Sequence, residues 1–325
     1  MSAKPGEPHP TPVGRWPGRS RHVDDLLCRR LRIGDSDNRY IRYVTDGITT
    51  LALAPGGEGR PYAPRDLADW LIAHGRHWVT LPEVAELLGL PADQVPPVVA
   101  RLRNKGQLFS PTRGAYVPIP PEYRSWGATP ASHFVDPLMA HLGHPYYVGL
   151  LSAAEIHGAA HQRPQVFQVV TTARLRDRAF GRVRIAFVTS ARAAYRPTTT
   201  LNTPTGTMVV ATPEVTVLDL VASPRRGGGL SNVATVAAEL VGDGRLDIQA
   251  LTAAAGTYPL AVVQRAGWLV DHVAGLLGIG VDTGSLVLLA AERTEPTALA
   301  AGGRRSGALD ERWNVLVNTA VEPDL

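Results

Sequence analysis

The stretch LPADQVPPVVARLRNKGQLFSPTRGAYVPI, residues 90–119, decides how the first folded part of the chain is interpreted. Its first half predicts a helix over roughly Ala92–Asn104, with a buried side formed by Val95, Val98, Val99 and Leu102. Its second half, KGQLFSPTRGAYVPI, predicts two short strands with PTRG as the turn between them. A helix followed by such a hairpin is typical of the reading helix and wing of a DNA-binding module.

Two further predicted helices precede this stretch. PRDLADWLIAHG places Leu67, Trp70, Leu71 and His74 at helical spacing. In TLPEVAELLG, Thr80 and Glu83 have the spacing of a capping box, and a glycine follows as the stop of the helix. Three short helices and a hairpin in this order predict a winged helix-turn-helix domain over residues 61–120.

The double proline in the third helix conflicts with this prediction at first sight. Pro96 lies in the first turns, where a proline inside a helix removes a backbone hydrogen bond and crowds the preceding turn. Proline is tolerated only at the start of a helix. We therefore expect a tight 3₁₀ turn at Pro91–Gln94 and a regular α-helix from about Pro96.

The outer side of this helix and the turn of the wing supply the candidate DNA-binding residues, namely Gln94, Pro97, Arg101, Arg103, Lys105 and Arg113. Arginine recognises guanine and glutamine recognises adenine through paired hydrogen bonds. With so few groups available, the basic residues fit phosphate contacts better than base readout. The alternative is a winged helix that contacts only proteins, with an ordinary solvated charged face.

Composition sets outer limits on the class of protein. The chain has 325 residues, a formal net charge of +4 and a sequence pI of about 9.4, which permits a nucleic-acid partner. It has one cysteine, so no internal disulfide can form. No apolar run reaches membrane-spanning length, and the amino-terminal residues lack a signal-peptide core. We expect a cytoplasmic protein without a membrane partner.

The residues before the winged helix are rich in proline, glycine and arginine. We expect residues 1–60 to be a disordered basic extension, within which Ile41–Val44 and Thr49–Leu53 have the pattern of short strands. The alternative is a basic arm that contacts DNA phosphates.

The remaining residues, 131–325, predict a larger domain of mixed α and β structure with a small sheet. Strands are expected at Val166–Thr171, in RVRIAFVTS and GTMVVAT, and late in the chain at Ser285–Leu289 and in RWNVLVN. Thr212 is the expected N-cap of a helix that opens with a proline. The proline-rich connector VPIPPEYRSWGATP predicts an extended, semi-stiff spacer between two separately folding domains. The fold class is therefore α+β.

Catalytic and metal-binding motifs are missing from the sequence. Neither HExxH, GxSxG nor a phosphate-binding GxxxxGK[ST] loop occurs. Asp219 with Asp243 or Asp247 resembles a nuclease carboxylate pair, but Lys105 is the only lysine beyond the extension, which argues against a D…ExK nuclease. Ser152 and Glu155 are better explained as the capping box of a helix start. We expect no catalytic residues, no metal and no cofactor.

The segments YYVGLLSAAEIHGAAHQRPQVFQVVT and VVATPEVTVLDLVASPRRGGGL resemble the AbiEi family, the antitoxins of bacterial type IV toxin–antitoxin systems. The resemblance covers roughly Tyr62 to the carboxy terminus and includes the order of the domains. It implies that the winged helix binds operator DNA upstream of its own gene and represses its operon. It also implies that the larger domain counters a partner toxin of the nucleotidyltransferase type.

Two other classes of function stay open at the level of sequence. One is a winged-helix transcriptional regulator without a toxin, whose second domain senses a ligand. The other is a nuclease or transferase guided to DNA by the winged helix, which should show a convergent set of acids, bases or metal ligands.

Overall fold

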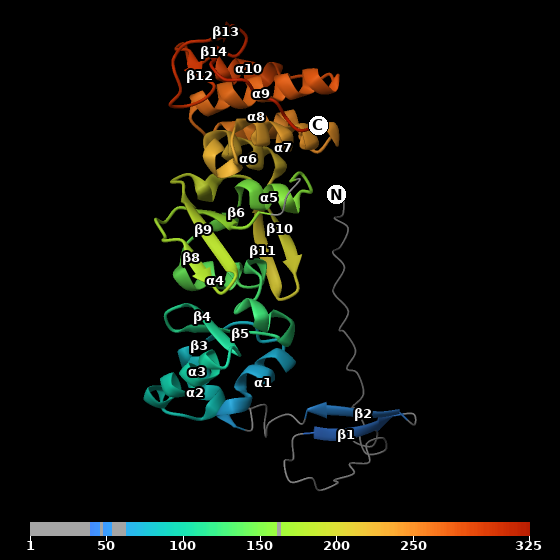
Figure 1. Ribbon diagram of the computed structural model, residues 1–325, viewed down its shortest axis with the longest axis vertical. Coiled ribbons are helices and arrows are strands. Elements are labelled where there is room, and N and C mark those ends of the chain that lie inside the picture. The colour runs from blue at the N-terminus through green and yellow to red at the C-terminus, as the bar shows by residue number, and fades with distance from the viewer. Residues whose placement is uncertain (1–39, 46–47, 54–62, 161–163) are drawn as a thin grey trace, which may run out of the picture. The chain divides into compact units, whose positions relative to one another are not determined.

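The computed structural model describes residues 40–45, 48–53, 63–160 and 164–325 (Figure 1). The chain divides into two compact units, Met1–Tyr62 and Ala63–Leu325. In the first unit, strands β1 (Tyr40–Thr45) and β2 (Ile48–Leu53) pair antiparallel. These strands contain both stretches of the extension that the sequence predicts as strands. The other residues of the extension, for which disorder is expected, lie outside the described residues.

The second unit opens with three helices and a small sheet. The helices are α1 (Leu67–Ala73), α2 (Leu81–Leu88) and α3 (Val95–Asn104). The described strands of this sheet are β3 (Val79–Thr80), β4 (Leu108–Thr112) and β5 (Ala115–Pro118), hydrogen-bonded in the order β3-β5-β4. Helices and sheet enclose an apolar cluster that includes the fully buried Leu67, Leu71 and Val84. The predicted helices and hairpin are thus present at the predicted places.

The connector after β5 differs from its prediction. Residues Pro121–Trp126 form a 3₁₀ helix, so the prediction of an extended spacer is wrong. The reason lies in the hairpin β4–β5 and the residue after it. Phe109 of β4, Val117 of β5 and the following Ile119 belong to the apolar cluster of the later residues rather than to that of the three helices. These side chains need a partner surface, and a connector that folds back provides it.

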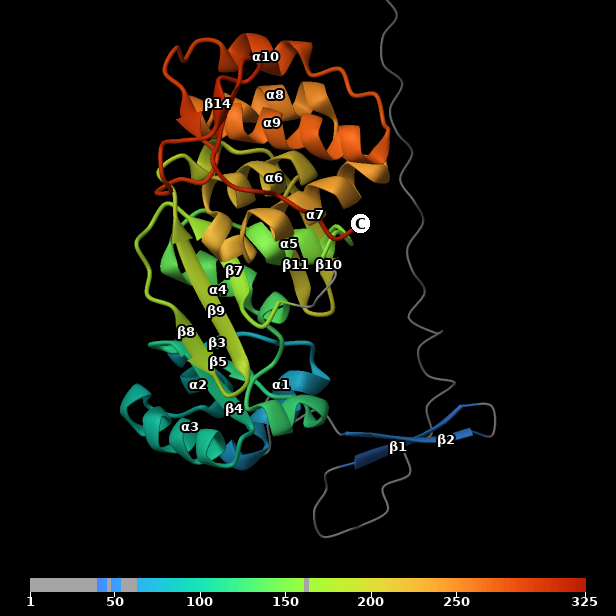
Figure 2. The ribbon, with the colours of Figure 1, turned by 45° about the horizontal axis from the view of Figure 1, so that its top comes forward.

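A mixed sheet forms the middle of the second unit. Its described strands are hydrogen-bonded in the order β10-β11-β6-β7-β9-β8. Their bounds are β6 (Tyr146–Val148), β7 (Phe167–Thr171), β8 (Arg178–Phe180), β9 (Val183–Thr189), β10 (Thr198–Thr203) and β11 (Gly206–Ala211). Strands β7 and β9 are parallel, as are β6 and β11, and the other neighbours are antiparallel. Helices α4 (Val135–Leu142) and α5 (Leu150–Ile156) lie beside this sheet (Figure 2).

A group of helices follows the sheet. Their bounds are α6 (Pro213–Ala222), α7 (Leu230–Gly242), α8 (Ile248–Ala255), α9 (Leu260–Leu277) and α10 (Gly284–Ala290). The Thr212 hydroxyl accepts a hydrogen bond from the Val215 N–H at 3.4 Å, so the predicted N-cap is confirmed. The short strands β12 (Thr297–Ala298), β14 (Val315–Val317) and β13 (Ala308–Asp310) pair in this order at the end of the chain.

In helix α9, Gly267 allows the aromatic ring of Trp313 to pack directly against the helix backbone. A Cβ atom added to Gly267 would lie 2.0 Å from the ring of Trp313, which is 1% exposed. The Trp313 indole N–H donates to Asp271 at 2.8 Å, which fixes the ring against the helix. The late strand β14 is thereby attached to the helical group through a contact that only glycine permits.

Two predictions for this part of the chain are wrong. Residues Ser285–Leu289 lie in helix α10, where Leu286 and Ala290 are buried four residues apart and Leu288 is 76% exposed. A short apolar run fits strand and helix equally well, so periodicity alone could not distinguish them. Ser152 does not cap a helix, because α5 begins two residues earlier, at Leu150. Among the described residues, no helix combines the length and apolar character that crossing a membrane requires.

Candidate nucleic-acid interface

Local interactions fix the geometry of helices α2 and α3. The Thr80 N–H and hydroxyl both donate to the Glu83 carboxylate at 2.7 Å, and Arg76 donates to the same side chain at 2.8 Å. Burial raises the pKa of Glu83, but the interactions with Thr80 and Arg76 together lower it by more. The pKa of Glu83 therefore lies below its usual value. Gly89 ends α2 in the left-handed conformation, with φ of +62°. The start of α2 and the turn toward α3 are therefore well defined.

The double proline lies where a helix tolerates it. Ala92–Gln94 form a 3₁₀ turn, and α3 begins at Val95, with prolines in its first positions. The first N–H groups of a helix have no partner within the helix, so Pro96 and Pro97 remove no internal hydrogen bond. The predicted change from 3₁₀ to α-helix is confirmed, with the boundary one residue earlier than expected.

All six candidate DNA-binding residues are exposed in the structure: Gln94, Pro97, Arg101, Arg103, Lys105 and Arg113. The opposite face of α3 is anchored by Val95, Val99 and Leu102, each at most 2% exposed. Arg113 lies in the turn between β4 and β5, next to Gly114 with φ of +78°. The structure thus presents these side chains on the outer side of α3 and on the tip of the hairpin.

Helical periodicity divides the α3 residues into a centre and two flanks. Ala100 and Arg101 each lie three or four residues from both Pro97 and Asn104, so these four residues share the outermost face, opposite the buried one. By the same periodicity, Arg103 and Lys105 lie on opposite flanks of this face. Ala100 and Asn104 were missing from the predicted site, although counting from the buried positions would have found them.

The cations of this surface are available to an external partner. Arg101, Arg103, Lys105 and Arg113 form no ion pair with another residue of the described part of the chain. The exposed Asn104 adds an amide that can donate and accept hydrogen bonds. A helix face and a hairpin tip that carry unpaired cations can contact phosphate groups on a nucleic-acid backbone.

A second polar group lies in the interior, around Asp219 of α6. The Asp219 carboxylate accepts hydrogen bonds from Arg196 at 2.7 Å, Tyr258 at 2.8 Å and Tyr147 at 2.9 Å. Arg196 also donates to the Tyr147 hydroxyl at 2.7 Å, and its guanidinium lies 3.9 Å from the centre of the Tyr258 ring. Sequence motifs could not reveal this cluster, because its members come from four distant segments.

The Asp219 cluster has the features of a structural group. Burial raises the pKa of Asp219, while Arg196 and the two tyrosine hydroxyls lower it. The pKa of Arg196 rises because Asp219, Tyr258 and Tyr147 together outweigh burial. Three donors converge on the Asp219 carboxylate, so we assign a charged pair. Both side chains are at most 8% exposed, which leaves no room for a substrate between them. Asp243 pairs with Arg245, and Asp247 caps α8, so the three aspartates form no common site.

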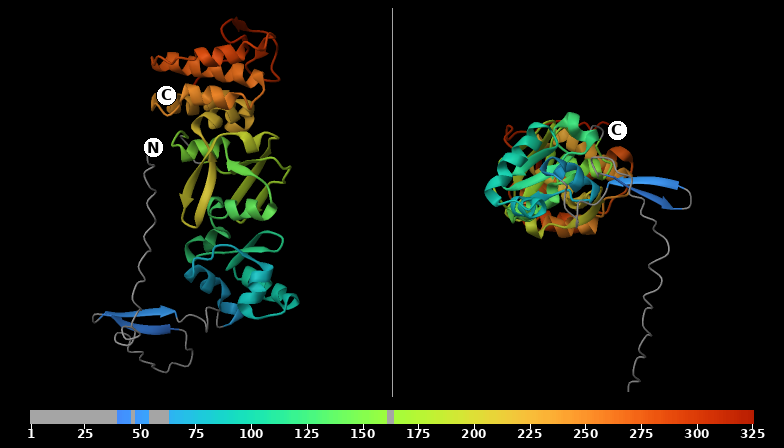
Figure 3. Two further views of the ribbon diagram at one scale, coloured as in Figure 1. Left: turned by 180° about the vertical axis from the view of Figure 1, so that it is seen from behind. Right: turned by 90° about the horizontal axis from the view of Figure 1, so that it is seen from below.

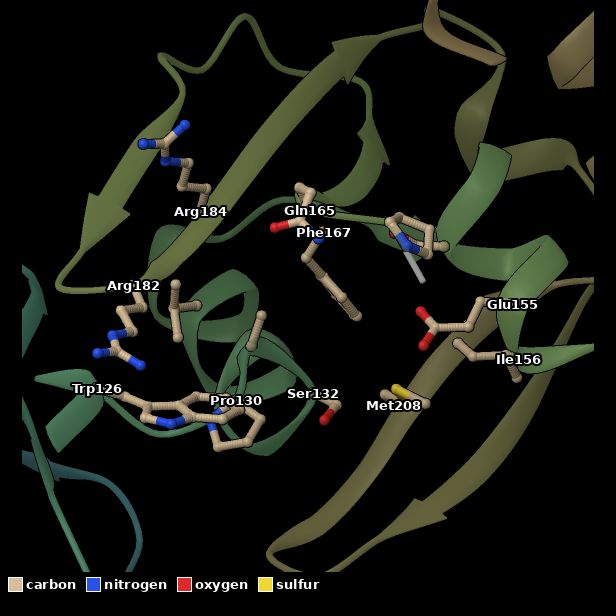
Figure 4. A pocket seen from close by; sticks show the side chains of 14 residues that line it. Trp126, Pro130, Ser132, Glu155, Ile156, Gln165, Phe167, Arg182, Arg184 and Met208 are labelled. Atoms are coloured by element: carbon tan, nitrogen blue, oxygen red, sulfur yellow. The ribbon is translucent and has the colours of Figure 1, made fainter. Parts of the chain in front are cut away.

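A cleft of ≈ 510 Å³ lies between the connector and the mixed sheet (Figure 4). Its walls are mainly apolar and include Trp126, Phe167 and Met208, with Glu155, Arg182 and Arg184 as charged groups. Figure 4 shows Arg182 beside Trp126 and Glu155 across the cleft, so its charged groups do not converge on one point. The size suits a small ligand, but the arrangement is not that of a nucleophile with its base. No group of three metal-binding side chains occurs among the residues that the structure describes.

Comparison with known proteins gives a match to a family model and a likeness to solved structures. Residues 147–272 match the family model of the AbiEi antitoxin C-terminal domain. The crystal structure of the RV2827C protein from Mycobacterium tuberculosis is similar, with a TM-score of 0.56 and 17% sequence identity, over 79% of this chain and 91% of that one. At this identity the likeness concerns the fold alone. No curated protein sequence matches the chain.

Proposed function

Because residues 147–272 match the family model of the AbiEi antitoxin C-terminal domain, we propose that the protein is the antitoxin of a bacterial type IV toxin–antitoxin system. In this proposal it counters a toxin of the nucleotidyltransferase type and represses its own operon by binding operator DNA. It needs no cofactor and performs no catalysis. The family match is the observation that carries the antitoxin role.

The DNA-binding role rests on residues 61–120, which we propose to be a winged helix-turn-helix domain. The order of α1, α2 and α3 followed by the β4–β5 hairpin supports this assignment. The exposed cations on α3 and at the tip of the hairpin support contact with DNA phosphates. We propose that Arg101, Arg103, Lys105 and Arg113 contact phosphates. Gln94 and Asn104 are the residues of this surface with side-chain amides for base contacts, and Pro97 supplies an apolar contact.

We propose that residues 131–325 form the antitoxin domain and work in one body with the DNA-binding domain. Phe109 of the hairpin belongs to the apolar cluster of the larger domain, which supports mechanical coupling of the two. Experiments that separate the two roles should therefore use the full chain with point substitutions rather than fragments.

Co-expression tests the antitoxin role. The full chain should restore the growth of cells that express the nucleotidyltransferase-type toxin encoded beside its gene. The same purified protein should shift DNA from upstream of its gene in a gel. A variant with Arg101→Ala and Arg113→Ala should lose most of the DNA shift and still restore growth if the toxin is countered independently of repression. Failure of the wild-type chain to restore growth would contradict the antitoxin role.

The cleft beside Trp126 favours a second candidate, a winged-helix regulator that senses a small ligand and has no toxin. The cleft has the size of a ligand site and is lined by connector residues that follow the proposed DNA-binding domain. This candidate predicts DNA binding without any rescue of growth, so the co-expression experiment distinguishes the two.

A further inference from the structure

Strand β10 leaves one edge of the mixed sheet open. Among the described strands, β10 has β11 as its neighbour on one side and none on the other. Figures 1 and 3 show the β10–β11 hairpin at the margin of the sheet from opposite sides. Four of its six residues, Thr198, Thr199, Thr200 and Asn202, are exposed. The backbone of β10 is therefore accessible to another strand.

Hydrogen bonds of β11 identify which backbone groups of β10 face outward. Val209, the partner of Thr200, directs its N–H away from β10, to the Tyr146 hydroxyl at 3.2 Å. Ala211, the partner of Thr198, accepts a hydrogen bond from His157 at 2.7 Å. These two pairs are thus the non-hydrogen-bonded pairs of the antiparallel ladder. It follows that Thr198, Thr200 and, by alternation, Asn202 direct their N–H and C=O groups toward the open edge.

The two edges of the sheet differ in how they are protected. Strand β8 at the opposite edge is three residues long, and its Arg178 is hydrogen-bonded to the Pro111 carbonyl of β4. Short length and a charged residue are devices that prevent strand addition. Strand β10 is six residues long, TTTLNT, and has no charged residue, bulge or internal proline. Pro197 and Pro204 adjoin its two ends and limit the open segment to these residues.

We propose that β10 is a homodimer interface at which a second copy of this chain adds its own β10 antiparallel. Around a two-fold axis at Thr200, Thr200 faces Thr200 of the other copy, and Thr198 faces its Asn202. The outward groups of these residues then exchange backbone hydrogen bonds in every pair. The strand is self-complementary because all of its side chains are uncharged, so no charges repel each other across the axis. The two mixed sheets become one continuous sheet across the dimer.

Disulfide trapping tests the partner and the register together. Cys28 is the single cysteine, so Cys28→Ser gives a background in which the full chain carries only introduced thiols. In this background, Thr200→Cys should form a covalent dimer under mild oxidation, because facing Cα atoms lie about 5.5 Å apart, within disulfide range. Thr198→Cys alone should form none, and Thr198→Cys combined with Asn202→Cys should restore the dimer. Equal crosslinking by all single variants, or none by Thr200→Cys, overturns the proposed register.

Sedimentation of the full chain tests the interface without crosslinks. One strand pair is a small interface, so dimers should form between about 1 and 100 μM protein. Thr200→Pro should be monomeric with an unchanged melting temperature, because the N–H that it loses faces the open edge rather than β11. Thr200→Val keeps this N–H and should still dimerise. A chain that stays monomeric at the highest concentration, or a dimer unaffected by Thr200→Pro, overturns the proposal. A monomer whose binding to the toxin is abolished by Thr200→Pro assigns the edge to the toxin instead of a second copy.

Discussion

The ring of Phe109 on β4 lies 5.1 Å from the ring of Phe134, next to the start of α4, in an edge-to-face contact. Phe180 of β8 lies 5.4 Å from Phe109 and completes a cluster of three aromatic rings. Through this cluster the hairpin after α3 shares a core with the mixed sheet. The unit Ala63–Leu325 should therefore unfold in one transition.

Phe109→Ala tests this coupling. The substitution should lower the free energy of unfolding by about 3–5 kcal/mol, as for other buried phenylalanines truncated to alanine. Near-UV circular dichroism and fluorescence should report coincident transitions for the wild-type chain during denaturation. The conservative Phe109→Leu should cost less because it keeps most of the buried volume. Two separate transitions in the wild-type chain would show that residues 61–120 fold independently of the sheet.

Arg101→Ala with Arg113→Ala should weaken DNA binding to all sequences alike. If each residue contacts one phosphate, the slope of log affinity against log salt should become shallower by roughly 2 units. Arg305→Ala, at an exposed position between β12 and β13, provides a matched control with the same loss of charge. Fluorescence anisotropy at several salt concentrations measures the slope. An unchanged slope in the double variant would remove both residues from the interface.

Asp219→Asn should lower the stability of the fold and should not remove any catalytic activity. Arg196 would remain buried without its counter-charge, which typically costs about 3–5 kcal/mol. Thermal unfolding measures this loss, with the exposed Asp282→Asn as a control. Incubation with nucleotides, RNA and DNA, with and without divalent metal, should give no turnover for either variant or for the wild type. Turnover that Asp219→Asn abolishes would contradict the proposal that the protein is no enzyme.

The stability that His133 contributes to the folded chain should decrease in acid. Burial and the nearby His77 lower the pKa of His133 below its ordinary 6.5, whereas Glu122 raises it less. The unfolded chain, in which the pKa of His133 is higher, therefore binds a proton more readily than the folded chain. The stability that neutral His133 contributes is present above pH 6.5 and is lost as the pH falls through the lower pKa of the folded chain. The melting temperature of His133→Gln should fall less on acidification than that of the wild type. His141→Gln, at an exposed position, should behave like the wild type.

Residues 1–60 should be dispensable for the folding of the second unit. They belong to a different compact unit from Ala63–Leu325, and their apolar groups are sparse. A chain that starts at residue 61 should melt within a degree or two of the full chain, since a segment with sparse apolar groups contributes little stability. A loss of many degrees would show that the extension packs on the second unit.

The sequence was sufficient where short-range rules decide the structure. The 3₁₀ turn before α3 followed from the position of Pro96, and the helix start at Thr212 followed from its hydroxyl and the proline after it. The exposed face of α3 followed from the spacing of its buried valines. In these cases the relevant interactions join residues within one turn of each other.

Contacts between residues far apart in the sequence could not be predicted from such short-range rules. The contact between Phe109 and Phe134 joins segments whose pairing no local pattern encodes, so the connector was wrongly predicted as a spacer. In the sequence, Asp219 with Asp243 or Asp247 resembles a nuclease carboxylate pair. Its true partners, Arg196, Tyr147 and Tyr258, come from other elements and leave no local signal. Only the tertiary structure distinguishes a buried ion pair from a carboxylate that faces a substrate.

The fit of Gly267 against Trp313 has a consequence for how the sequence can diverge. Any side chain at position 267 overlaps the indole ring, and a smaller residue at position 313 leaves a cavity against α9. Neither position can change first without a loss of stability, so drift at this pair must pass through a destabilised intermediate or proceed by a double change. Across homologous chains the two positions should therefore covary, with glycine opposite tryptophan and a larger residue opposite a smaller one.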